Sequence, residues 1–403
     1  MIFLSAGEVA GDRHGALLAR ALRERSDLAL WGLGGPAMAG AGVALLADTG
    51  ALGAVGLAES LPHAWAGWRI YRRARRALRQ RPPRVAVLVD YPAVNVPLAR
   101  VLRDLGVPVV YYLPPEEWFW SSRGNGLLDR GRRIAGRADL VLAAHEREAA
   151  AYRALGARVQ LIGHPLQDLM RTRQPSRSIA RAALGVADDV PLVGLFPASR
   201  RQELRLVLPT LLGAAAILAD DPRLRFALPV AAAFLAEPIQ RAVADYPTLT
   251  GRLQVVVDTD PSQATARVLA AADLALAKSG TVTLELALGG VPQVVVYRFG
   301  ALTEWLGRHL LGLSEVDFRR VALPNLILDE DLLPELLQHA ATPQAVAAAA
   351  LPLLEGPPRA RQLAGYGRLR ERLGGPGAVD RAATAILEYL GCVDGRSDPD
   401  EPP

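Results

Sequence analysis

A turn of three small residues, Ser279, Gly280 and Thr281, could bind a phosphate group. Within residues 274–290 it follows an apolar run that predicts a buried strand and precedes a helix-forming run stopped by two glycines. Such a turn presents backbone N–H groups and the positive end of a helix dipole to an anion. Glu285 lies one helical turn beyond Thr281, so its carboxylate can reach a sugar hydroxyl. An ordinary strand–helix corner is the commoner explanation of this stretch taken alone.

Three acidic residues lie where predicted strands end in the first half of the chain. Glu8 and Asp12 follow the short strand of residues 2–5, and Asp90 ends the strand of residues 85–90. Ligands bind at this edge of open α/β sheets, where a carboxylate can act as a general base on a hydroxyl group. The simpler interpretations are that Asp12 caps a helix and that Asp90 caps a turn.

The first strand is predicted to lead into a loop over residues 6–15 and then into a helix over residues 16–23. Three glycines in this loop allow close backbone approach, and His14 adds a further polar side chain. A solvated helix residue is the simpler interpretation of His14.

The second half of the chain restarts the pattern. A buried strand at residues 192–196 is followed by residues 197–203, where Arg200 can neutralise a diphosphate leaving group and Ser199 and Glu203 add polar groups. Two halves of this kind predict two facing Rossmann-like α/β domains with a cleft between them.

We expect the first domain to cover residues 1–166 and to receive two C-terminal helices within residues 358–390. The polar, proline-containing stretch after residue 166 marks the boundary, so the second domain covers residues 167–357. Residues 391–403 are acidic and rich in proline, which predicts a disordered tail.

Composition places the chain among globular proteins. Its 403 residues are 51% apolar and 22% charged, enough for two domains with full cores. A single cysteine, Cys392, excludes an internal disulfide, and neither a secretory signal nor a bilayer-spanning run is recognisable. The net charge is +5, and almost all of the basic residues are arginines. Arginine suits phosphates and lipid headgroups, but this composition gives little support for binding to nucleic acid. Lys278, the only lysine, adjoins the small-residue turn and is a candidate phosphate contact.

Residues 62–81 have the pattern of a helix that lies in an anionic membrane interface. Arginines cover one face, Trp65 and Trp68 lie near the start, and the apolar stripe consists of Ile70, Tyr71, Ala74 and Leu78. A helix packed on its own domain would show the same pattern. Trp118 and Trp120 could hold an acyl chain or pack in a core.

Nine segments, taken together and in order, resemble the lipid-A-disaccharide synthase family of inverting glycosyltransferases, which have the two-domain GT-B fold. The likeness runs from about residue 2 to residue 390. The segments are AGEVAGDRHGA (6–16), VGLAESL (55–61), VLVDYPAVN (87–95), YYLPPEEWFW (111–120), GHPL (163–166), ASRRQE (198–203), SGTVTLE (279–285), LPN (323–325) and PELLQ (334–338).

The resemblance implies transfer of 2,3-diacylglucosamine from UDP-2,3-diacylglucosamine to 2,3-diacylglucosamine 1-phosphate, giving a β-1,6 disaccharide and UDP. It implies that Asp90 is the catalytic acid/base and that Glu8, Asp12 and Asn325 line the cleft. It places UDP against Arg200, Ser279, Gly280, Thr281 and Glu285. It also implies a peripheral location on the cytoplasmic face of the membrane and leaves room for a homodimer.

Neither a metal nor another cofactor is expected. Asp258 and Asp260 have the D-x-D spacing that holds a divalent cation in single-domain glycosyltransferases, but the two-domain layout does not require one. Residues 32–37 match a dinucleotide fingerprint, yet they follow the second strand and lack the expected acidic partner, so we interpret them as a glycine turn.

The chain departs from the family at four positions that concern the acceptor more than UDP. Ala93 and Val94 replace a common Asp-Phe pair, Pro114 replaces serine, and Ser121 replaces arginine. Two alternatives stay open: another GT-B enzyme such as a UDP-GlcNAc 2-epimerase, and a non-catalytic UDP-sugar-binding protein at a membrane surface.

Overall fold

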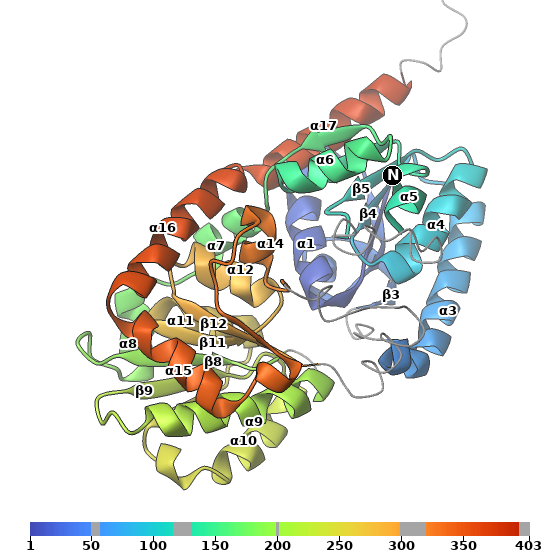
Figure 1. Ribbon diagram of the computed structural model, residues 1–403. Helices are drawn as coiled ribbons and strands as arrows, with labels where there is room; N and C mark the ends of the chain where they lie inside the picture. Colours follow the sequence, from blue (N-terminus) through green and yellow to red (C-terminus); the bar gives the residue numbers. More distant parts are fainter. Residues whose placement is uncertain (50–56, 116–129, 199–200, 299–319, 395–403) are drawn as a thin grey trace, which may run out of the picture. The chain divides into compact units, whose positions relative to one another are not determined.

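The computed structural model describes residues 1–49, 57–115, 130–198, 201–298 and 320–394, which fold as two compact α/β units. The first unit comprises Met1–Asp168 together with the chain from Leu373 onward, and the second comprises Leu169–Arg372. Each unit is a parallel sheet with helices packed on it (Figure 1). The prediction of two parallel-sheet α/β domains is therefore confirmed.

The first unit contains a seven-stranded parallel sheet in the order β3-β2-β1-β4-β5-β6-β7. The strand order reverses between β1 and β4, which is the position where open α/β sheets bind ligands. The strands are β1 (Ile2–Ala6), β2 (Leu30–Gly34), β3 (Ala44–Asp48), β4 (Val85–Val89), β5 (Val109–Tyr112), β6 (Leu140–Ala143) and β7 (Val159–Leu161).

Helices bury both faces of this sheet. Alternation along β1 directs Ile2 and Leu4 to the core beneath α1 and α17, and Phe3 to the core beneath α3 and α4. Helix α17 lies beside α1 (Figure 1). The helices are α1 (Glu8–Arg25), α2 (Pro36–Gly40), α3 (Leu57–Gln80), α4 (Pro92–Asp104), α5 (Arg130–Ala135), α6 (Glu146–Ala154) and α17 (Ala378–Asp394).

The second unit contains a six-stranded parallel sheet in the order β10-β9-β8-β11-β12-β13, with its reversal between β8 and β11. The strands are β8 (Leu192–Phe196), β9 (Arg225–Pro229), β10 (Leu253–Val256), β11 (Leu274–Lys278), β12 (Gln293–Tyr297) and β13 (Glu335–Leu337). The main helices are α8 (Arg177–Leu184), α9 (Arg201–Leu218), α10 (Ala236–Ala244), α11 (Pro261–Ala271), α12 (Thr281–Leu288), α14 (Leu323–Leu328), α15 (Pro343–Leu354) and α16 (Pro357–Arg372); α7 (Leu166–Arg173) spans the boundary between the units.

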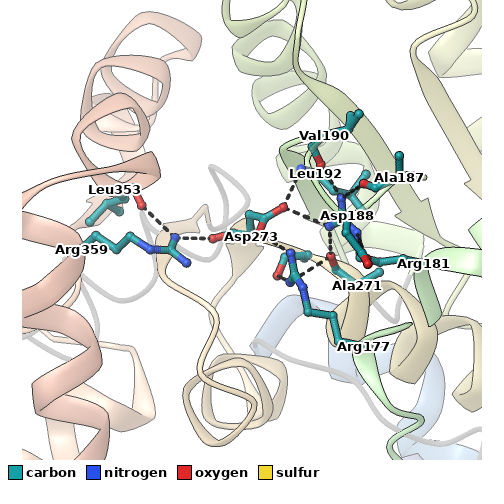
Figure 2. A network of polar contacts seen from close by, with 11 residues as sticks. Arg177, Arg181, Ala187, Asp188, Val190, Leu192, Ala271, Asp273, Leu353 and Arg359 are labelled. Atoms are coloured by element: carbon teal, nitrogen blue, oxygen red, sulfur yellow. Dashed lines mark hydrogen bonds and ion pairs between the residues drawn. The ribbon is translucent and has the colours of Figure 1, made fainter. Parts of the chain in front are cut away.

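A buried charge network fixes the start of β11 in the second unit (Figure 2). Arg181, which is only 1% exposed, donates to the Asp273 carboxylate at 3.1 Å and to the Ala271 carbonyl at 2.9 Å. The same carboxylate accepts the Leu192 amide at 2.9 Å, and the Asp273 carbonyl accepts from Arg359 at 2.7 Å. Asp273 therefore joins α8, β8, β11 and α16.

The return of the chain to the first unit begins later than expected. Helix α16, which was expected to pack on the first domain, contacts α12, α14 and α15 and belongs to the second unit. Only α17 packs on the first unit, where its apolar face contacts α1. Asp168 accepts the amides of Gly377 and Val379 at 2.6 and 3.0 Å, and the His164 amide donates to the Leu373 carbonyl at 3.0 Å, so the outgoing and returning segments are tied together.

Two other segments differ from expectation. Helix α17 continues to Asp394, so the first four residues of the predicted disordered tail are helical, and the remainder lies outside the described residues. The leucine-rich sequence of residues 334–338 predicts the start of a later helix or part of one, but Glu335–Leu337 form β13 because this segment pairs with the edge of β12. Pairing with a neighbouring strand outweighs the local leucine pattern.

Candidate active site

Glu8 and Asp90 lie at one edge of the first sheet. Strand β1 pairs in parallel with β4 so that Ala6 is opposite Val89, and each acid follows the end of its strand. Both residues have left-handed backbones, with φ of 59° for Glu8 and 41° for Asp90. Residues other than glycine rarely adopt this conformation, and such strain is concentrated at functional sites. The structure thus brings these two predicted catalytic residues to the reversal point of the sheet.

Asn95 holds the backbone of Asp90 in this conformation. Its side-chain amide donates to the carbonyls of Asp90, Val89 and Ser5 at 2.8, 3.0 and 3.2 Å, and its oxygen accepts from the Ser5 hydroxyl at 2.6 Å. The Tyr111 hydroxyl also donates to the Asp90 carbonyl at 2.8 Å. The Asp90 side chain itself is exposed. Sequence reasoning missed Asn95 and Ser5, although a serine in the apolar strand β1 and an asparagine among the apolar residues of the first half of α4 were usable signals.

Glu8 lies close to the aromatic ring that follows Asp90. Burial and the negative charge of Glu8 raise the pKa of the Tyr91 hydroxyl. The ring packs on Gly7, where an added Cβ would lie 2.2 Å from it. Gly7 thus lets Tyr91, and with it the Asp90 backbone, approach the end of β1.

Helix α1 begins at Glu8 and not at Ala16, so the expected loop over residues 6–15 is wrong. The glycines that suggested a loop are helical and allow close packing: an added Cβ at Gly15 would lie 2.6 Å from the Met38 sulfur. His14 is buried in this helix and not solvated, and burial together with the charge of Arg13 lowers its pKa to about 4. It is therefore neutral at pH 7.

The carboxylate of Asp12, a predicted catalytic residue, binds backbone amides of the protein. Its carboxylate is 5% exposed and accepts the backbone amides of Gly35, Met38 and Ala37 at 2.8, 3.0 and 2.9 Å. These amides form the N-terminus of α2, which has no other side-chain cap. Asp12 caps a neighbouring helix and not its own.

The small-residue turn in the second unit has the predicted form. Strand β11 ends at Lys278, Gly280 is the N-cap residue, and α12 begins at Thr281. The N-cap residue Gly280 makes no side-chain cap to this helix, and within its first turn the Thr283 amide donates to the Gly280 carbonyl at 3.0 Å. Glu285 lies one turn further along and is half-buried.

Ser279, predicted to contact UDP, and Asn325, predicted to line the cleft, form hydrogen bonds with the segments that precede and follow α14. The Ser279 hydroxyl donates to the Val321 carbonyl at 2.6 Å. Asn325 is 1% exposed; its amide donates to Glu335 and to the Leu333 carbonyl at 2.6 and 3.0 Å, and its oxygen accepts the amides of Leu332 and Leu333. All four hydrogen-bonding positions of this side chain are occupied within the protein.

Lys278 and Glu203 are brought together. The Lys278 Nζ lies 2.7 Å from Glu203 Oε1, and the two side chains are only 14% and 9% exposed. The ion pair joins the end of β11 to the first turn of α9, next to the segment that contains Arg200. Ser199 and Arg200, like Trp118 and Trp120, lie outside the described residues.

The family model described as lipid-A-disaccharide synthetase matches residues 2–388. A lipid-A-disaccharide synthase of Prochlorococcus marinus (strain MIT 9313) is 41% identical over 396 residues, which cover 96% of this chain and 98% of that protein. The chain belongs to the lipid-A-disaccharide synthase family. Membership makes it a glycosyltransferase of lipid A biosynthesis.

Solved structures of low sequence identity share the fold. A Staphylococcus aureus MnaA structure with UDP has a TM-score of 0.69 at 14% identity and covers 97% of this chain and 96% of its own. The calicheamicin glycosyltransferase CalG4 has a TM-score of 0.61 at 15% identity, with coverage of 97% and 98%. The predicted GT-B fold class is thereby confirmed for this member of the synthase family.

The D-x-D acids of this synthase-family chain are engaged in local structure. Asp258 forms an ion pair with Arg267 at 2.8 Å, and Asp260 caps α11 by accepting the Ser262 amide at 2.9 Å. Across the part of the chain that the structure describes, no group of three or more His, Cys, Asp or Glu side chains could hold a metal ion.

Helix α3 has the predicted apolar stripe, and its opposite face carries arginines in solvent. Ala74 and Leu78 are buried in the first unit. Trp65 and Trp68 are 66% and 44% exposed and stack at 5.1 Å between ring centroids, with the Arg72 guanidinium 4.6 Å from the Trp68 ring. None of the helices within the described residues has the length and apolarity needed to span a bilayer.

Proposed function

We propose that this glycosyltransferase moves 2,3-diacylglucosamine from UDP-2,3-diacylglucosamine to the 6-hydroxyl of 2,3-diacylglucosamine 1-phosphate, with inversion. Family membership across residues 2–388 supports these substrates. The observation that carries the chemistry is the exposed Asp90 carboxylate on a strained, firmly held backbone at the reversal point of the first sheet.

Asp90 acts as the general base of this reaction. Its carboxylate takes the proton from the acceptor hydroxyl as that oxygen bonds to the anomeric carbon of the donor sugar. The bond from that carbon to the diphosphate oxygen breaks in the same step, and UDP leaves with the electron pair. Attack on the face opposite UDP inverts the anomeric centre without a covalent intermediate. Glu8, at the same edge, orients the acceptor through its hydroxyl groups.

The N-terminus of α12 receives the donor diphosphate. The uncapped first turn at Gly280 and Thr281 offers backbone amides and the helix dipole, and Glu285 accepts from the ribose hydroxyls. Arg200 neutralises charge on the leaving diphosphate. Lys278 holds the start of α9 through its ion pair with Glu203. Ser279 bonds to Val321, just before α14, and Asn325 of α14 bonds to Glu335 of β13, which fixes the segment that contacts the turn. UDP in the MnaA structure supports a UDP-sugar in this fold.

Helix α3 attaches the enzyme to the cytoplasmic face of the membrane, where its lipid substrates lie. The stacked Trp65 and Trp68 suit the headgroup region, and the exposed arginines of the same helix suit anionic lipids. This location supplies both acylated substrates without requiring the chain to cross the bilayer.

The experiment that tests this function is a product assay in detergent with UDP-2,3-diacylglucosamine and 2,3-diacylglucosamine 1-phosphate. Formation of the disaccharide together with an equal amount of UDP is expected. UDP release without the acceptor would indicate a hydrolase or an epimerase instead. Tight binding of UDP with no turnover on the acceptor would favour a binding protein.

A further inference from the structure

An open cavity of about 420 Å³ lies between α3, α4 and α5 of the first unit, whose positions are labelled in Figure 1. Five of its residues come from one face of α4, from Pro92 to Arg100, and the others from α3, from α5 and from the chain just after α5. The lining consists of Tyr71, Pro92, Ala93, Val96, Pro97, Arg100, Arg133 and Arg137. Its volume is in the range of small-molecule sites.

The charged groups of this lining are all positive. Three of the eight lining residues are arginines and none is acidic. Burial and the positive charges of Arg100, Arg133 and Arg103 lower the pKa of Arg137, and the carboxylate of Asp104 offsets them only in part. Four arginines therefore create a local excess of positive charge that an anion would relieve.

The most buried of these arginines is held in place. Arg137 donates to the Val96 carbonyl of α4 at 2.8 Å, which fixes the guanidinium against the cavity wall. Arg103 is likewise bonded to the Gly136 carbonyl. A guanidinium carries five N–H donors in a planar fork, and this geometry matches phosphate oxygens. Arg100 and Arg133 also line the cavity and are exposed.

The rest of the lining is apolar. Pro92, Val96, Pro97 and the ring of Tyr71 form a wall that runs along α4 toward its N-terminus. Between Pro92 and Arg100 the helix rises roughly 12 Å. A ligand that fills the cavity would therefore place a phosphate near the arginines and an apolar or sugar portion near the start of α4, two residues after Asp90.

We propose that this cavity binds the phosphate of an anionic amphiphile. Two molecules supply that chemistry: the 1-phosphate of the lipid acceptor, an assignment that rests on the proposed function, and the headgroup of a membrane phospholipid. In the first case the cavity sets acceptor specificity; in the second it orients the enzyme on the bilayer.

The test compares the parent with Arg100→Gln and Arg100→Gln/Arg133→Gln. The matched control is Arg20→Gln, which removes an exposed arginine on α1 of the same unit, away from the cavity. One arm measures acceptor and donor KM and kcat in detergent. The other measures cosedimentation with vesicles of phosphatidylglycerol and phosphatidylcholine, and of phosphatidylcholine alone.

An acceptor site predicts that acceptor KM rises about fivefold for each arginine removed, with donor KM and kcat unchanged. A headgroup site predicts a similar loss of affinity for the anionic vesicles, with unchanged kinetics in detergent. If the double variant matches Arg20→Gln in both arms, the proposal is overturned. If the parent forms no disaccharide, the proposed function has failed, and the vesicle arm alone then decides the role of the cavity.

Discussion

Asp90 and Asp12 both follow strands of the first sheet at its carboxyl edge, yet their side chains have different surroundings. Asp90 presents an exposed side chain while Asn95 and Tyr111 hold its backbone carbonyl. Asp12 is buried, and three backbone amides of the second βα turn occupy its carboxylate. The proposed transfer of a hydroxyl proton to Asp90 rests on this difference in exposure.

Replacement of Asp12 by alanine is expected to affect folding and not chemistry. Loss of charge-assisted bonds to three amides should lower the free energy of unfolding by about 2 to 3 kcal/mol. Urea unfolding measures this loss, and kcat per folded molecule should change little. A stable variant with a kcat as low as that of an Asp90 variant would show that Asp12 acts in the reaction.

The sequence identifies which residues stand at the ligand edge, but not which way their side chains turn. Asp12, Ser279 and Asn325 were predicted to contact ligands and instead bind backbone groups. A residue that contacts a ligand and a residue that binds the backbone can have the same type and the same position in a motif. A carboxylate or an amide side chain accepts a hydrogen bond from a ligand as readily as from a buried N–H. Only the tertiary neighbours, such as the turn before α2, distinguish them.

At the scale of elements, the strands were largely predictable because parallel strands buried on both faces are continuous apolar runs. Helix boundaries were less so: α1 begins eight residues earlier than expected because its glycines serve packing and do not break the helix. The contacts of α16 with α12, α14 and α15 could not be predicted, since an amphipathic helix does not reveal which sheet it covers.

The contribution of the Asp273 network to the stability of the second unit can be measured by substitution. Asp273→Asn would leave the Arg181 charge buried without its carboxylate, which should cost about 3 to 5 kcal/mol in unfolding free energy. Glu237→Gln, which removes an exposed pair with Arg241 on α10, is the control and should change stability by less than about 0.5 kcal/mol. If chemical denaturation gave equally small losses of unfolding free energy for Asp273→Asn and Glu237→Gln, the network would not stabilise the second unit as argued.

For the molecule as a whole, the two units share the strand order around the reversal of their sheets and differ in the groups that they present. The first contains the exposed carboxylate of Asp90, a helix with exposed tryptophans and arginines, and an arginine-lined cavity. The second contains a helix N-terminus without a side-chain cap next to a buried ion pair. The repeated strand-first pattern indicated this division, because each half places its polar residues after its first strand and after the strand across the reversal.

Attachment of the whole enzyme to lipid is expected to depend on the stacked pair on α3. Trp65→Ala and Trp68→Ala should each weaken binding to anionic vesicles about tenfold, because each ring buries apolar area in the interface. Phe234→Ala removes a comparably exposed ring from the second unit and should have no effect. Cosedimentation in which all three variants behave alike would argue against α3 as the membrane contact.

The most direct test of the account is the turnover of Asp90→Asn beside Asp27→Asn, which alters an exposed aspartate elsewhere in the first unit. The general-base role predicts that disaccharide formation by Asp90→Asn falls by about 10²- to 10⁴-fold, with unchanged thermal stability and UDP affinity. Asp27→Asn should retain full activity. A folded Asp90→Asn variant with a kcat close to that of the parent would contradict the central claim that this carboxylate takes the acceptor proton.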